Sequence, residues 1–94
     1  MKRCTMISEK VTVQNKLGLH ARAASVFVKK AMGFSSAITI SNSKADGNGK
    51  SIMSMMMLEA SQGTELELKI EGEDEQLALQ ALIELIEKKF GEDE

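Results

Sequence analysis

The chain has 94 residues and a formal net charge of -2, with 43% hydrophobic and 28% charged residues. This length suits a single domain over residues 1–94, and the hydrophobic fraction suffices for a packed core. The charge balance offers no basic excess for nucleic acid, so we expect no nucleic-acid partner. No stretch approaches the ~20 apolar residues of a membrane span. We therefore expect a soluble, cytoplasmic protein without membrane insertion, and a monomer.

Hydrophobic periodicity predicts seven elements. Alternation is clearest at 64–71, where Leu66, Leu68 and Ile70 face one way and charged residues the other, as in a strand. Helical spacing is clearest near the C-terminus, where we expect an apolar stripe. The predicted elements are strand 6–14, helix 21–32, strand 37–41, a very short strand within 42–50, helix 52–60, strand 64–71 and helix 74–90. The stripe of the last helix comprises Leu77, Ala81, Leu82, Leu85 and Ile86.

The charged face of strand 64–71 predicts a sheet with one side in water. Antiparallel sheets tolerate that arrangement, whereas parallel sheets are usually covered on both faces. All helices would then cover the other face, which gives a two-layer sandwich.

The chain contains one histidine, His20, and one cysteine, Cys4. A single cysteine excludes an intramolecular disulfide. One histidine and one cysteine do not make a metal ligand set, so we expect neither a metal nor a cofactor.

His20 stands where the loop 15–19 becomes a helix. The first turn of a helix has N–H groups without helical partners and a partial positive charge, which together bind anions. A phosphoryl group on the His20 ring would lie beside these donors, and Arg22 in the same turn could add a bidentate contact. Spacing alone leaves open the alternative that His20 is only a capping or surface residue.

Residues 15–24 read NKLGLHARAA, and residues 49–58 read GKSIMSMMML. These two segments and their spacing resemble the two motifs of the HPr family, the histidine phosphocarriers of the bacterial phosphoenolpyruvate-dependent phosphotransferase system. The resemblance extends over residues 9–90, which is nearly the whole chain.

The resemblance implies an α+β fold, an open-faced two-layer sandwich of βαββαβα order. Its antiparallel four-stranded sheet would have the order 1-4-2-3, with three helices on one face. By resemblance, His20 accepts a phosphoryl group from Enzyme I through Nδ1 and passes it to an Enzyme IIA domain, assisted by Arg22. Ser51 matches the serine that HPr kinase/phosphorylase modifies in many members. The protein would then be a phosphoryl carrier for sugar transport and not a true enzyme.

Two positions depart from the family pattern. Ala23 stands where many members have proline, and Ser54 stands where glycine is frequent. The Ala23-Ala24 pair and the methionine-rich second helix also resemble the nitrogen-related branch, NPr, which regulates rather than feeds sugar uptake. An NPr-like regulatory phosphocarrier is therefore the alternative function.

Ile52, Met53 and Met56 share one side of the predicted helix 52–60. We expect them to be exposed, and Met55 and Leu58 to turn into the core. The resemblance places the exposed three in an apolar docking patch beside the active histidine. Core filling is the alternative role for such methionines.

Ser25 and Lys29, on the first helix, match further partner-facing positions of the family, although Lys29 alone would more often be solvated charge. Two rival functions belong to other classes. A ligand-binding regulatory module would need a lined cavity, for which this chain has little room. An interaction module that used only the methionines would not need His20.

Overall fold

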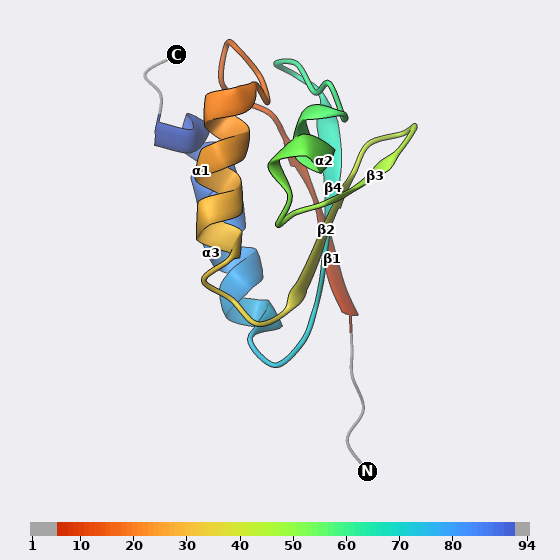
Figure 1. The fold of residues 1–94 in the computed structure, drawn as a ribbon, viewed down its shortest axis with the longest axis vertical. Coiled ribbons are helices and arrows are strands. Elements are labelled where there is room, and N and C mark those ends of the chain that lie inside the picture. The colour runs from red at the N-terminus through yellow and green to blue at the C-terminus, as the bar shows by residue number, and fades with distance from the viewer. Residues whose placement is uncertain (1–5, 92–94) are drawn as a thin grey trace.

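The computed structural model describes residues 6–91, so Cys4 lies outside the described residues. The elements follow the predicted order and are labelled in Figure 1. They are β1 (Met6–Thr12), α1 (Ala21–Ala31), β2 (Ala37–Ser41), β3 (Asp46–Asn48), α2 (Ile52–Met56), β4 (Glu65–Glu71), α3 (Glu75–Glu87) and a 3₁₀ turn, η1 (Lys89–Gly91).

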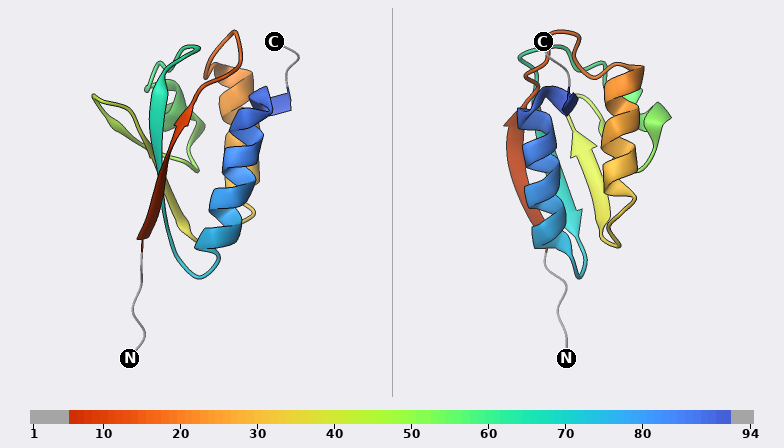
Figure 2. Two further views of the ribbon diagram at one scale, coloured as in Figure 1. Left: turned by 180° about the vertical axis from the view of Figure 1, so that it is seen from behind. Right: turned by 90° about the vertical axis from the view of Figure 1, so that its left-hand side faces the viewer.

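The four strands form one sheet of order β1-β4-β2-β3 in which every neighbouring pair is antiparallel. β4 is central, so that Leu68 pairs with Glu9 of β1 on one side and with Ile40 of β2 on the other. The left view of Figure 2 shows α1 and α3 packed on one face of this sheet. The predicted open-faced α+β sandwich and its 1-4-2-3 order are confirmed.

One core lies between the sheet and the helices. Leu66, Leu68 and Ile70 of β4 are buried, while Glu65 and Glu71 on the opposite face are exposed, as the alternation predicted. α1 contributes its small residues and one aromatic ring, and α2 contributes Met55. Within residues 6–91, no helix is long and apolar enough to cross a membrane.

The second helix is shorter than the predicted 52–60. α2 ends at Met56, and Glu59 then adopts a φ of 52°, which turns the chain out of the helix. The carbonyl of Ala60 accepts the N–H of Leu19 at 2.8 Å. The helix therefore stops early because the segment after it bonds to the loop that precedes α1.

The last helix also ends earlier than the predicted 74–90. α3 stops at Glu87, and Lys89 and Phe90 have φ values of 60° and 56°. These left-handed conformations cost non-glycine residues roughly 1–2 kcal/mol each. The break turns the Phe90 ring into the core, where it is buried, and this burial offsets the strain.

Leu77 was predicted to belong to the apolar stripe of the last helix, and this was wrong because Leu77 is exposed. Leu77 lies one residue before the buried Ala78, so its side chain is rotated by about 100° from that of Ala78 about the helix axis. The buried positions of α3 are Ala78, Leu82 and Ile86, and Ala81 and Leu85 are half-buried.

Asp74, directly before α3, joins two loops that are far apart in sequence. Its carboxylate makes no side-chain cap to its own helix. It accepts the hydroxyl of Ser36, the N–H of Ser35 at 2.9 Å and the N–H of Ser36 at 3.0 Å. The Ser36 hydroxyl, followed by the Ser35 N–H, lowers the pKa of Asp74 from its ordinary 3.8.

This carboxylate should make the fold sensitive to acid. A lowered folded-state pKa gives stability that is present above pH 3.8 and lost as the pH falls through the folded value. We expect Asp74→Asn to unfold at a lower temperature than the wild type at pH 7, with the gap closing below pH 3.8. Thermal unfolding over this pH range measures the effect, with Glu73→Gln as the matched control. A gap that stayed constant with pH would contradict the assignment.

Candidate functional site

His20 is the N-cap of α1. Its backbone is extended (φ -88°, ψ -177°), and its carbonyl accepts the N–H of Ala24 at 2.8 Å, which opens the helix. The ring Nδ1 accepts the N–H of Arg22 at 3.3 Å. A nitrogen that accepts a hydrogen bond is unprotonated, so the lone pair of Nδ1 points at the start of the helix. The ring is half-buried and therefore still reachable from solvent.

The loop before His20 is held in a fixed shape. Asn15 is fully buried, and its side-chain Nδ2–H donates to the carbonyl of Gly18 at 2.8 Å. Gly18 has a φ of 71°, and a Cβ there would lie 2.5 Å from the carbonyl oxygen of Ala60. Only glycine fits such an approach. The loop thus sets the direction in which His20 enters α1.

The exposed side of α1 carries the other predicted residues of this helix. Arg22, Ser25 and Lys29 are all exposed and follow one another at spacings of three and four residues, so they form one line along the surface. Helical side chains lean toward the N-terminus, which directs the Arg22 guanidinium to the His20 end. Ala23, where the family often has proline, is fully buried.

Ser51 is the N-cap of α2. Its backbone is extended, and its hydroxyl oxygen accepts the N–H of Ser54 at 3.3 Å. The side chain is half-buried. The N–H of Ser51 donates to the carbonyl of Asn48 at 3.0 Å, which fixes the turn that leads into the helix. Ser51 therefore caps α2, independently of any role as a phosphorylation site.

The outer surface of α2 is apolar. Ile52, Met53 and Met56 are exposed as predicted, and Met55 and Leu58 are buried as predicted. Met57, the C-cap, is 76% exposed and lies one helical turn from Met53, which is 75% exposed. Ile52, Met53, Met56 and Met57 are called the methionine face below.

α2 lies beside the N-terminal half of α1 in Figure 1 and again in the right view of Figure 2. Since α1 begins after His20, the methionine face is close to the histidine end of α1. Arg22, at the start of the exposed line on α1, and the methionine face on α2 therefore lie near the same end of the molecule.

Sequence reasoning assigned no role to Met57 or to Leu17, an exposed leucine of the loop before His20. The i,i+4 spacing from Met53 was a signal for Met57. Leu17 carried no periodic signal, because its exposure follows from the irregular loop.

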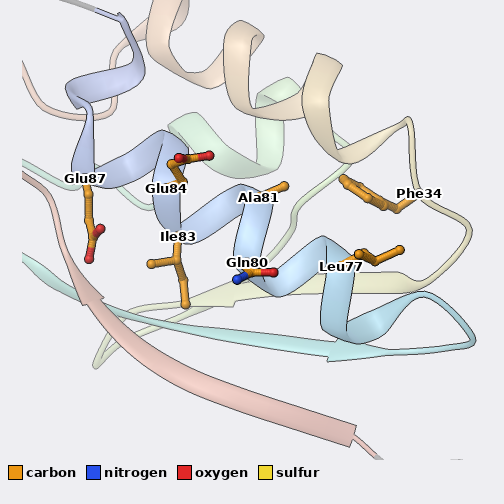
Figure 3. A pocket seen from close by; sticks show the side chains of 7 residues that line it. All are labelled: Phe34, Leu77, Gln80, Ala81, Ile83, Glu84 and Glu87. Atoms are coloured by element: carbon orange, nitrogen blue, oxygen red, sulfur yellow. The ribbon is translucent and has the colours of Figure 1, made fainter.

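The groove in Figure 3 lies along α3 and contains none of the predicted site residues. It measures about 640 Å³, with Phe34 and Leu77 toward one end and Glu84 and Glu87 toward the other. Ile83 and Glu87 turn to a different side of α3 from Ala81 in the same view, so the lining is open rather than enclosed. This groove is therefore separate from the predicted histidine site.

Three comparisons agree with one another. A family model described as "PTS HPr component phosphorylation site" matches residues 7–88. The phosphocarrier protein HPr of Xylella fastidiosa (strain Temecula1) is 50% identical over 88 residues, which cover 94% of this chain and 99% of the relative. The crystal structure of HPr-C-His from Thermoanaerobacter tengcongensis has a TM-score of 0.89 at 45% identity, covering 94% of this chain and 99% of the other. The crystal structure of an HPr dimer from that organism has a TM-score of 0.74 at 47% identity, covering 98% and 100%.

The chain is an open-faced α+β sandwich with a half-buried histidine, His20, at the start of its first helix. The family match extends from β1 to the end of α3 and includes His20. The chain belongs to the HPr family, the phosphocarriers of the phosphotransferase system.

Proposed function

We propose that this protein accepts a phosphoryl group from Enzyme I on Nδ1 of His20 and passes it to an Enzyme IIA domain, in the cytoplasm. The single observation that carries the proposal is the hydrogen bond from the Arg22 N–H to Nδ1. It directs the nucleophilic lone pair to the N–H groups of a helix start, where phosphate oxygens are stabilised.

The transfer balances without a cofactor. The Nδ1 lone pair attacks the phosphorus carried by Enzyme I and forms an N–P bond, while the bond to the donor group breaks and its electron pair stays with the donor. The Arg22 N–H leaves Nδ1 and donates to a phosphate oxygen. Its bond to Nδ1 is 3.3 Å long, beyond the common range, so giving it up costs little. Transfer to the acceptor reverses these steps.

The direct test is mass spectrometry after incubation with Enzyme I and phosphoenolpyruvate. We expect a gain of one phosphoryl group that acid removes and that maps to His20. A subsequent incubation with an Enzyme IIA domain should transfer the group. A phosphoryl group that mapped to any other residue would contradict the proposal.

Arg22 should matter for transfer more than for folding. Its guanidinium can form charge-assisted bonds to the phosphoryl group, so Arg22→Ala should slow transfer by about tenfold. The side chain is exposed, so the unfolding free energy should change by less than ~0.5 kcal/mol. Quench-flow transfer rates and thermal unfolding measure the two effects, with Lys30→Ala as the control. A normal transfer rate in Arg22→Ala would show that Arg22 is only a solvated charge and does not assist transfer.

The methionine face should dock both partners. Met53→Glu would bury an unpaired carboxylate in the complex, so KM for transfer from Enzyme I should rise by about tenfold while kcat changes little. The matched control is Met32→Glu, because Met32 is equally apolar and exposed but caps the far end of α1. Equal KM values for the two variants would exclude the methionine face as the interface.

Ser25 and Lys29 extend the proposed docking surface along α1, and the lysine suits a partner with acidic groups. We propose a monomer as the working unit. The dimeric HPr of Thermoanaerobacter tengcongensis is the contrasting case. Light scattering at working concentration distinguishes the two states.

An NPr-like regulatory phosphocarrier is the second candidate function. Ala23 and the methionines of α2 favour it, and the two branches differ in acceptor. Phosphorylated protein should be offered in parallel to a sugar-specific and to a nitrogen-related Enzyme IIA domain. The faster acceptor identifies the branch.

A further inference from the structure

The methionine face has an unusual chemical composition. Three of its four residues are thioethers, and Met53 and Met57 are about three-quarters exposed while Met56 is 42% exposed. Leucine or isoleucine would supply the same apolar area without a sulfur that oxidants attack. Exposure to solvent is what gives an oxidant access to a thioether.

We propose that Met53, Met56 and Met57 form an oxidation-sensitive modification site, and that their sulfoxides weaken docking and so slow phosphoryl transfer. The inference rests on the proposed function, because it names a regulation of the same docking surface. The co-reactant is a peroxide. The thioether sulfur gives up two electrons and gains one oxygen, while the O–O bond of hydrogen peroxide breaks and its other oxygen leaves as water.

The sulfoxide changes the surface and leaves the core intact. It converts a flexible apolar side chain into a polar one with a strong acceptor, which must lose its water when a partner docks. The neighbouring Met55 is fully buried in the core and is shielded from the oxidant. Oxidation should therefore lower affinity for the partner while the thermal unfolding temperature stays the same.

The chain supplies its own control methionines. Met6 begins β1 and Met32 caps the far end of α1, and both are exposed. They should oxidise as readily as the methionine face without touching the docking surface. An effect that depends on position can thus be separated from general oxidative damage.

The experiment uses the full chain carrying Cys4→Ser, so that thiol oxidation does not contribute. Three proteins are compared: this background, Met53→Leu/Met56→Leu/Met57→Leu, and Met6→Leu/Met32→Leu. Each is treated with hydrogen peroxide, freed of peroxide with catalase, and compared with its own untreated sample in Enzyme I-dependent phosphorylation. Peptide mass mapping locates the added oxygens.

We expect oxygen at positions 53, 56 and 57 and none at Met55. KM should rise by about tenfold after treatment in the background and in Met6→Leu/Met32→Leu, and by less than about twofold in the triple leucine variant. Methionine sulfoxide reductase should restore the lost affinity.

Three results would overturn the proposal: positions 53, 56 and 57 unmodified while Met6 and Met32 gain oxygen, an unchanged KM despite confirmed sulfoxides, or an equal rise in the triple leucine variant. Failure of the proposed function would look different, because the untreated protein would then gain no phosphoryl group.

Discussion

Replacing His20 with asparagine should abolish phosphorylation by Enzyme I while the fold and its stability remain. Asparagine is a favoured N-cap residue, and its side-chain oxygen can accept the Arg22 N–H that Nδ1 now accepts. Its amide nitrogen is not nucleophilic, so position 20 then has no acceptor atom for the phosphoryl group. Mass spectrometry after incubation with Enzyme I and phosphoenolpyruvate measures the loss.

His20→Ala supplies the comparison. It removes the nucleophile and the cap together, and loss of an N-cap costs about 1 kcal/mol of stability. We therefore expect both variants to be unphosphorylated and only the alanine variant to unfold at a lower temperature. Phosphorylation of either variant at the wild-type level would refute a carrier role for His20.

Phosphorylation of Ser51 should slow transfer from Enzyme I to His20 by about a hundredfold. A phosphoserine carries about -1.5 to -2 charges at pH 7 and would sit next to Ile52, at the edge of the methionine face. Arg22 and Lys29 are exposed on the neighbouring helix, so the matching partner surface should be acidic and would repel the new charge. Juxtaposed like charges cost several kcal/mol, which exceeds the roughly 2.8 kcal/mol that corresponds to a hundredfold change in rate.

Ser51→Asp and Ser51→Asn separate charge from capping. Both side chains can accept the Ser54 N–H that the serine hydroxyl now accepts, and only the aspartate adds a negative charge. Transfer to Ser51→Asn should be close to normal, and transfer to Ser51→Asp should be slower. Identical rates for phosphorylated and unmodified protein would leave Ser51 as a helix cap.

The sheet could be predicted because its signals are local. The alternation of β4 specifies a strand within a few residues. The short strand expected within 42–50 is β3, and it is made of Asp46, Gly47 and Asn48. The position of His20 at a helix start was also predictable, because its motif is a continuous segment. The exposure of Ile52, Met53 and Met56 was predictable from their helical spacing and their motif.

The ends of α2 and α3 could not be predicted in the same way. Glu59, Lys89 and Phe90 adopt left-handed conformations without glycine. The next residue after Glu59, Ala60, bonds to the distant Leu19, and Phe90 is buried in the core. Asp74 looked like an ordinary helix start, yet its carboxylate bonds to Ser36, 38 residues earlier. Such features appear only once the layers are assembled.

The position of His20 at a helix cap links the unfolding free energy of the protein to the hydrolysis free energy of its phosphohistidine, which are usually measured separately. If Nδ1 carries the phosphoryl group, the folded and unfolded chains, each with and without that group, form a closed thermodynamic cycle. Any difference in unfolding free energy between the phosphorylated and free protein must then equal the difference in hydrolysis free energy between phosphohistidine in the unfolded chain and in the fold. A helix start that stabilised the phosphate too well would make a poor donor. The 3.3 Å bond from Arg22 belongs to the unphosphorylated side of this cycle, where a weak cap lowers the cost of placing the phosphoryl group on Nδ1.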